Sequence, residues 1–266
     1  FDSRDNCNAI IETVSNTLIQ GCSNTIIPAS VTTIGEYAFQ ASNLTSITIP
    51  EGVTYISSNA FRLCEELETI ILPEGLQAIG NEAFFNCKKL QSIIIPKSVT
   101  SFGWGVFLFC TSLSSISIDW PDEITSIPAD MFDGCHNLTS INIPESVTSI
   151  ENFAFRNCYN LIDINIPKSV KTIGQRAFYG CSGLTKIPDG LTYIGDEAFS
   201  YCHNITSVSI PEDITYVGYR AFEGCTGIKS ISFPESMGGF ETDDLWGLFR
   251  VDSSNVESIS FHSSNP

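Results

Sequence analysis

Residues 67–89 read LETIILPEGLQAIGNEAFFNCKK, and residues 161–183 read LIDINIPKSVKTIGQRAFYGCSG. Both are copies of one unit, L-x-x-I-x-I-P-x-x-V-T-x-I-G-x-x-A-F-x-x-C-x-x. Its phenylalanine recurs at intervals of 21 to 25 residues, and we call the nine members of this series the spine phenylalanines: Phe39, Phe61, Phe84, Phe107, Phe132, Phe155, Phe178, Phe199 and Phe222. A period this short cannot bury a core within one copy, so successive coils must stack and cover one another.

The first part of the unit has the pattern of a β-strand. In residues 44–49, Ile47 and Ile49 alternate with polar residues, which is the period of a strand with one buried face. Pro50 follows and ends the strand, because proline has no N–H group for a ladder hydrogen bond. Stacked coils would align these strands into one parallel sheet, with the alternating polar residues on its exposed face.

The second part of the unit returns the chain to its starting side. Val53 and Ile56 point back inward, Ala60 and Phe61 begin a tight turn or a short helix, and Cys64 closes the coil. We therefore predict a leucine-rich-repeat solenoid that is right-handed, with a parallel β-sheet on one side and turns and short helices on the other. The spine phenylalanines would form a continuous buried row.

A glycine follows the second isoleucine of the unit in six copies: Gly35, Gly80, Gly103, Gly174, Gly195 and Gly218. This position does not require a positive φ angle, because equivalent places carry Ser57, Pro128 and Glu151, and proline is fixed near a φ of about −65°. Crowding between coils or chance explains these glycines better.

The repeated phrase resembles the BspA-type leucine-rich repeat, a family found in surface proteins of gut and oral bacteria and of some parasitic protists. The resemblance covers roughly residues 23–234. It implies a solenoid fold and a role in extracellular adhesion or partner binding. Because the matching residues belong to the core, the resemblance specifies the fold more sharply than the function.

Charge and hydropathy narrow the classes of partner. The 266 residues include 30 acidic and 13 basic side chains, for a net charge of −17, which repels nucleic acid and anionic membranes. Apolar runs such as residues 93–95 fall far short of the about 20 residues of a spanning helix, so we expect no membrane insertion within this segment. Phe1 begins the chain without an initiator Met or an apolar leader, so we expect the natural N-terminus, with any secretion signal, to precede it.

Residues 1–22 do not follow the repeat and read as a hairpin cap, with strands at residues 8–12 and 17–21. If Glu12 lies opposite Thr17, the same register sets Cys7 opposite Cys22, so either a cross-strand disulfide or two separate thiols would fit. Residues 23–234 form the repeats. Residues 235–266 are a degenerate last repeat or a C-terminal cap, with an acidic stretch from Glu241 to Asp244, an apolar group at residues 245–249, and a last strand at Val256, Ile259 and Phe261.

Two copies depart from the regular length. Asp119 and Trp120 are inserted between Ile118 and Pro121, and two residues are missing after Ile187, so that Pro188 arrives early. The strand that ends at Ile187 should therefore be short or bulged.

Residues with catalytic or metal-binding potential have simpler explanations. Eight cysteines lie three residues after a spine phenylalanine: Cys64, Cys87, Cys110, Cys135, Cys158, Cys181, Cys202 and Cys225. Their side chains would run parallel on stacked coils, which favours a buried row of reduced thiols over disulfides. The sequence contains no C-x-x-C pair, which is the usual spacing of zinc ligands. His136 and His203 directly follow Cys135 and Cys202, and adjacent side chains on a turn point apart. We expect no metal, no cofactor and no catalytic residue.

The candidate partner-binding residues are apolar side chains at positions that are polar in most copies: Ile71, Ile94, Trp104, Leu108, Phe109 and Trp120. The two isoleucines fall on the outward positions of neighbouring strands. The other four concentrate apolar area in the two central copies, either as exposed interaction anchors or packed against the Asp119–Trp120 insertion.

The sequence therefore predicts a non-enzymatic binding module on a cell surface or in secreted form. A protein partner, such as a host or extracellular-matrix protein, is the leading hypothesis. A glycan-binding surface and a rigid spacer that displays other domains are the alternatives.

Overall fold

The structure is a computed structural model that describes residues 7–235, residue 247 and residues 256–262. The expectations for residues 241–246, 248 and 249 lie outside the described residues. The chain divides into two compact units. Unit 1 comprises residues 1–124 and 130–141, and unit 2 comprises residues 125–129 and 142–266.

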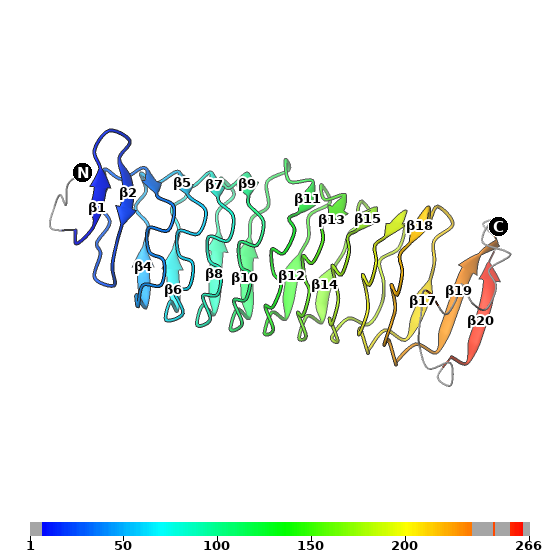
Figure 1. The fold of residues 1–266 in the computed structure, drawn as a ribbon. Coiled ribbons are helices and arrows are strands. Elements are labelled where there is room, and N and C mark those ends of the chain that lie inside the picture. Colours follow the sequence, from blue (N-terminus) through cyan, green and yellow to red (C-terminus); the bar gives the residue numbers. More distant parts are fainter. Residues whose placement is uncertain (1–6, 236–246, 248–255, 263–266) are drawn as a thin grey trace. The chain divides into compact units, whose positions relative to one another are not determined.

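The coils of unit 1 contribute strands to two series of parallel pairs, which we call front and back strands, and the first coil contributes a back strand alone (Figure 1). The front strands are β4 (Ser46–Thr48), β6 (Thr69–Ile71), β8 (Ser92–Ile95) and β10 (Ser115–Ile118). The back strands contain two residues each: β3 (Thr33–Ile34), β5 (Tyr55–Ile56), β7 (Ala78–Ile79) and β9 (Ser101–Phe102). The segments around the spine phenylalanines are turns, one of the two forms that the sequence predicted.

Unit 2 repeats this arrangement. Its back strands are β11 (Ser126–Ile127), β13 (Ser149–Ile150), β15 (Thr172–Ile173), β16 (Tyr193–Ile194) and β18 (Tyr216–Val217). The later front strands are β12 (Ser140–Asn142), which crosses from unit 1 into unit 2, then β14 (Asp163–Asn165), β17 (Ser207–Ser209), β19 (Ser230–Pro234) and β20 (Ser258–His262). The predicted last strand is present as β20, which pairs in parallel with β19.

The register of the front strands follows the alternation in the sequence. Ile47 pairs with Ile70 between β4 and β6, and both side chains are buried. The flanking Ser46 and Thr48 are exposed, as is Thr69. The prediction of parallel strands with one buried and one exposed face is thus confirmed. Over the residues that the structure describes, the expected single sheet is not formed, because the front strands pair as separate groups: β4 with β6, β8 with β10, β12 with β14, and β17 with β19 and β20.

The stretch after Leu184 is the exception. Residues 184–188 are described and extended, but none of them belongs to a strand. The loss of two residues from this copy explains the change, because Pro188 occupies a place where other copies still have strand. The predicted short or bulged strand is reduced to chain without strand pairing.

The N-terminal hairpin is present and joins the back strands of unit 1. Strand β1 (Ile10–Glu12) pairs antiparallel with β2 (Thr17–Gln20), and β2 pairs in parallel with β3. Glu12 lies opposite Thr17 as expected, but a bulge between Ile10 and Ile11 shifts the register by one residue. The expected alignment of Cys7 with Cys22 is therefore wrong: Cys7 is buried, Cys22 is exposed, and both are free thiols.

The spine phenylalanines pack as parallel rings inside each unit. Ring centroids of consecutive members from Phe39 to Phe132 lie 5.0 to 5.7 Å apart with interplanar angles of 4° to 10°. In unit 2 the series from Phe155 to Phe222 shows 5.3 to 5.6 Å and 1° to 8°. At these centroid distances the rings are in the range of offset stacking, which adds to the free energy gained from burial.

Two positions in every coil adopt the left-handed backbone conformation. They lie two residues before and two residues after each spine phenylalanine, and glycine occupies only four of the eighteen places. Around Phe61, for example, Asn59 has a φ of 60° and Leu63 a φ of 61°. A non-glycine residue pays about 1–2 kcal/mol for this conformation, so the coil geometry is imposed by stacking and not by local preference.

The glycines after the second isoleucine are explained by crowding. A Cβ atom on Gly80 would lie 2.4 Å from the backbone nitrogen of Ser58 in the preceding coil, and one on Gly103 would lie 2.3 Å from that of Asn81. None of these six glycines has a positive φ angle. The interpretation that no left-handed conformation is required at this position is confirmed.

Replacement of a buried spine ring should destabilise unit 1 strongly. Phe84→Ala removes a ring that stacks on both Phe61 and Phe107 and is fully buried. We expect a loss of roughly 3–5 kcal/mol in the free energy of unfolding, measured by chemical denaturation. Phe85→Ala, at the adjacent half-buried position, should lower the free energy of unfolding by less. Equal losses in the two variants would contradict the proposed contribution of the spine phenylalanines to stability.

Release of backbone strain should have the opposite sign. Ala41 is exposed and has a φ of 54°, so Ala41→Gly should stabilise the protein by about 1 kcal/mol. The matched control Ala78→Gly, in back strand β7, should destabilise it by about 0.5–1 kcal/mol. Thermal unfolding of both variants checks the pair, and a destabilising effect at residue 41 would refute the strain argument.

Candidate partner-binding surface

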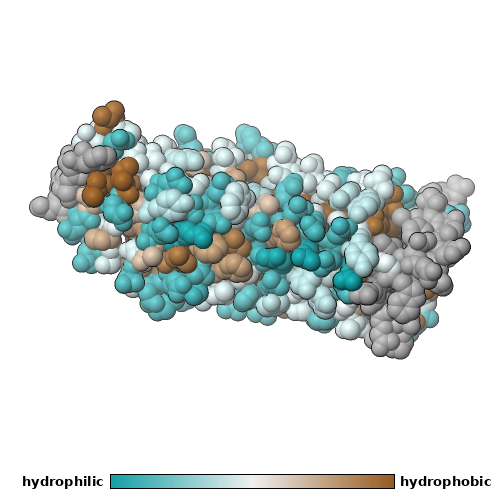
Figure 2. Space-filling model, viewed as in Figure 1, coloured by the Kyte–Doolittle hydropathy of each residue, from teal (hydrophilic) through white to brown (hydrophobic). Residues whose placement is uncertain are grey.

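Ile71 and Ile94 lie together on the front face of unit 1. They are 63% and 73% exposed and belong to the neighbouring strands β6 and β8. The strand register places Ile71 beside Thr48 and Ile94 beside Ser117. The two isoleucines are therefore apolar members of a series of outward residues that otherwise carry hydroxyl groups. Figure 2 shows brown side chains among teal ones over this part of the front strands.

A third apolar residue, Ile26, extends this surface and was missed in the sequence. It is 77% exposed and lines one shallow groove of about 610 Å³ together with Thr48 and Ile71. A second groove of about 510 Å³ joins Ile71 to Ile94. The signal was present, because residues 25–28 read Thr-Ile-Ile-Pro and align with the Ile-Thr-Ile-Pro of residues 47–50. We call Ile26, Thr48, Ile71 and Ile94 the front apolar row.

The central aromatic residues do not form a second exposed patch. Trp104 is 44% exposed, and its backbone N–H donates to Asn81 Oδ1 at 3.1 Å. Phe109 is half-buried, with its ring edge-on to that of Phe85 at a centroid distance of 5.8 Å. Trp104, with somewhat less than half of its surface accessible, is thus the one exposed member of this group.

Leu108 and Trp120 have to be withdrawn as exposed anchors, because each is only 8% exposed. The two-residue insertion allows the Trp120 ring to fold back onto Phe102, with ring centroids 5.7 Å apart. Burial of an indole ring removes far more apolar area from water than any polar residue at this place would, so the inward packing wins.

The cysteines three residues after the spine phenylalanines form an inward row, as the sequence predicted, and all eight are buried and free. In seven of the coils the S–H group donates to the carbonyl of the spine phenylalanine one coil earlier, as in Cys64 to Phe39 at 2.9 Å and Cys225 to Phe199 at 3.0 Å. Burial raises the pKa of the Cys64 and Cys225 thiols to about 12. These two thiols are therefore protonated at neutral pH, and burial with a hydrogen bond to the preceding coil gives the row a structural role.

His203, which follows Cys202, does not form a Cys–His pair with it. His203 is exposed while Cys202 is buried, and the His203 ring contacts Thr226 Oγ1 through Nδ1 at 3.3 Å. Within residues 7–235 and the described part beyond them, no three His, Cys, Asp or Glu side chains are grouped so as to hold a metal ion. Over the same residues, no helix has both the length and the apolar character needed to cross a membrane.

The fold and this surface define a parallel-strand β-solenoid of the leucine-rich-repeat class. Residues 12–120 and 109–188 match the BspA type leucine-rich repeat region in six copies. The match covers more than half of the chain, and the protein belongs to the BspA-type leucine-rich repeat family. None of the curated proteins compared with this chain matches it.

Solved structures of bacterial proteins show the same fold. A leucine-rich repeat protein from Bacteroides ovatus is 29% identical with a TM-score of 0.66, over 87% of this chain and 67% of that one. A leucine rich cell surface protein from Faecalibacterium prausnitzii is 27% identical with a TM-score of 0.53, over 83% and 73%. The pneumococcal vaccine antigen PcpA shares the fold at 20% identity and a TM-score of 0.62; the match covers 89% of this chain but only 61% of that antigen.

Thiol reactivity tests the assignment of the cysteine row. Cys22 is the one exposed thiol among the ten cysteines, which are all within the described residues. We expect a chromogenic disulfide reagent at pH 8 to titrate about one thiol per native chain rapidly and the other nine only on unfolding. Cys22→Ser should abolish the fast phase. Two or more fast thiols in the native protein would show that the row is accessible.

Proposed function

We propose that this chain is a non-enzymatic binding module that holds a protein partner against the front apolar row of unit 1. The observation that carries the proposal is the exposure of Ile71 and Ile94, at 63% and 73%, on adjacent strands. Apolar side chains grouped on a rigid polar surface are typical of interaction sites, because their burial by a partner contributes binding free energy without a loss of backbone entropy.

The surroundings of the row favour a protein over other partners. Ser46, Thr69 and Ser92 flank it as exposed hydroxyl groups, which can complete a polar rim. The net charge of −17 favours partners with a basic or neutral surface. An extracellular-matrix protein or another secreted host protein fits this description, and Trp104 is a separate candidate contact.

We further propose that the protein acts at a cell surface or after secretion. Support comes from the family and from the Faecalibacterium prausnitzii relative, which is described as a cell surface protein. The buried cysteine row agrees with either a reducing or an oxidising compartment, because the thiols lie on parallel positions of stacked coils and do not pair. The proposed location therefore rests on the family and on this relative, and not on the cysteines.

Glycan binding is the second candidate function, since exposed hydroxyls and Trp104 would also suit a sugar. The two candidates differ in what the isoleucines do. A protein partner buries Ile71 and Ile94, whereas a sugar stacks on an aromatic face and gains little from branched aliphatic side chains. If the chain is a spacer, substitutions at Ile71, Ile94 or Trp104 would not change binding.

Substitution within the front apolar row tests the proposal. We expect the purified protein to bind at least one member of an array of immobilised extracellular-matrix and secreted host proteins. The double variant Ile71→Asp, Ile94→Asp should weaken that binding by about 30-fold or more, because loss of central apolar contacts costs on the order of 2 kcal/mol. Biolayer interferometry measures the change.

The matched control is Val14→Asp, which adds a charge to the hairpin turn at a residue that is 94% exposed. It should leave binding unchanged. Equal binding by the Ile71, Ile94 double variant, or loss of binding only in Trp104→Ser, would overturn the assignment of the row. Binding to a glycan array without binding to proteins would favour the second candidate.

A further inference from the structure

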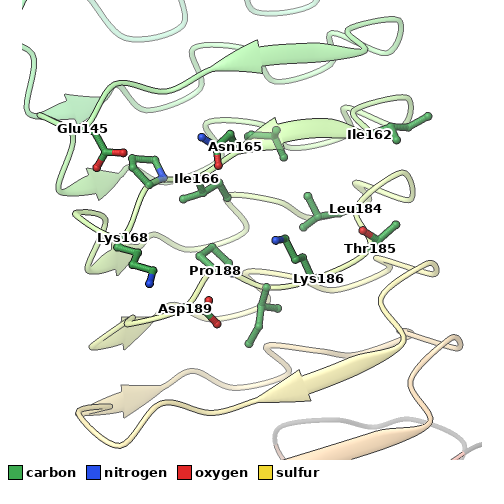
Figure 3. A pocket seen from close by; sticks show the side chains of 13 residues that line it. Glu145, Ile162, Asn165, Ile166, Lys168, Leu184, Thr185, Lys186, Pro188 and Asp189 are labelled. Carbon is green, nitrogen blue, oxygen red and sulfur yellow. The ribbon is translucent and has the colours of Figure 1, made fainter.

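The irregular coil in unit 2 leaves a groove in its front face. The groove has a volume of about 550 Å³ and lies between β14 with the residues that follow it and the extended stretch 184–189. Figure 3 shows this stretch running without a strand arrow past Thr185, Lys186 and Pro188. The groove lies where that coil departs from the regular length, and grooves of about 610 and 510 Å³ also lie on the front face of regular coils in unit 1.

The backbone bordering the groove lacks hydrogen bonds that some pairs of regular coils make, although the regular front strands β6 and β8 lack them as well. In a regular pair of coils, the N–H of Lys229 donates to the carbonyl of Thr206 at 2.9 Å, and the N–H of Ile210 donates to that of Ser232 at 2.9 Å. The equivalent donors at the groove are Thr185 and Ile166. Among the described residues, neither makes a backbone hydrogen bond to the neighbouring coil.

The opposite side of the irregular coil shows the same loss. The bond equivalent to that from Lys229 to Thr206 would here run from the N–H of Thr206 to the carbonyl of Thr185. No such bond is present within the described part of unit 2. The stretch 184–188 is therefore unpaired on both sides, and its residues Thr185 and Lys186 are exposed. Unpaired strand edges of this kind accept an added strand.

The side chains around the groove give it a charge pattern that is unusual for this protein. Lys168 and Lys186 line it, two of only 13 basic residues in a chain of net charge −17. Both are exposed, and neither forms an ion pair among the described residues. Glu145 and Asp189 lie at the end of the groove near Lys168 (Figure 3). Lys186 lies along its length, opposite Asn165.

We propose that this groove binds an extended peptide segment of a partner protein by strand addition, with an acidic side chain of the segment directed at Lys186. The added backbone supplies acceptors and donors for the groups that the shortened coil leaves unpaired. A stretch of five residues, 184–188, corresponds to a peptide of about five residues at about 3.3 Å per residue. This site is in unit 2 and is independent of the front apolar row in unit 1.

A peptide of defined sequence tests the proposal. The probe is a fluorescein-labelled, capped hexapeptide with alternating valine and aspartate, and its binding to the full chain is measured by fluorescence anisotropy. We expect the double variant Lys168→Glu, Lys186→Glu to weaken binding at least tenfold. Lys97→Glu is the matched control and should bind like the parent, because Lys97 follows Pro96 as Lys168 follows Pro167 but lies in a regular coil of unit 1.

Two further measurements separate strand addition from simple charge attraction. N-methylation of alternate peptide bonds in the probe should abolish binding in one phase of the alternation and leave it within about twofold in the other, because only one edge of an added strand faces each neighbour. Insertion of Asn-Ile between Ile187 and Pro188 restores the regular length and should abolish binding, while circular dichroism and thermal unfolding show a folded chain.

Unchanged binding by the insertion variant, or equal binding by both N-methylated probes, would overturn the proposal. Absence of probe binding together with binding of a neutral oligosaccharide, lost in the insertion variant, would also overturn it and reassign the groove to a glycan. The two proposals fail separately. If the Ile71, Ile94 double variant binds protein partners like the parent while the probe still binds the groove, the proposed function fails. If the probe does not bind while the front apolar row still binds its partner, this inference fails.

Discussion

Contact between successive coils is the constraint on which the rest of this protein depends. A single 23-residue copy has neither a core nor a closed set of backbone hydrogen bonds. Stacking supplies both. Within each unit the ring centroids of consecutive spine phenylalanines lie 5.0 to 5.7 Å apart, and backbone amides donate to the next coil, as from Phe61 to Ala83 at 2.8 Å. The same stacking holds residues such as Leu63 in a left-handed conformation that they would not adopt alone.

Much of this architecture was predictable because the signal is repeated. Alternation at Ile47 and Ile49 gave the front strands, and the recurring phenylalanine gave the buried row. The back strands were not predicted, because two residues such as Tyr55 and Ile56 are too few to show a period. The left-handed positions were also hidden, since residues as different as Arg176 and Glu197 occupy them and no composition marks the site.

The candidate surface was predictable only in part, and the reason is geometric. Ile71 and Ile94 stood out because they break a strict alternation, and exposure at such positions follows from the pleat of a strand. Leu108 and Trp120 belong to turns and an insertion, where the direction of a side chain depends on three-dimensional packing against residues such as Phe102. The groove beside residues 184–188 was implied by a deletion in the sequence, but its unpaired backbone was visible only in the structure.

The antiparallel hairpin at the start of the chain has a consequence for solubility. A stack of parallel strands ends in an open edge, which would pair with the edge of another molecule. Strands β1 and β2 cover β3, and the bulge at Ile10 and Ile11 distorts the outermost strand so that it presents a poor template for further pairing. The hairpin thus covers the edge of back strand β3 against pairing with another molecule, while the coils that follow remain free to vary their outward residues.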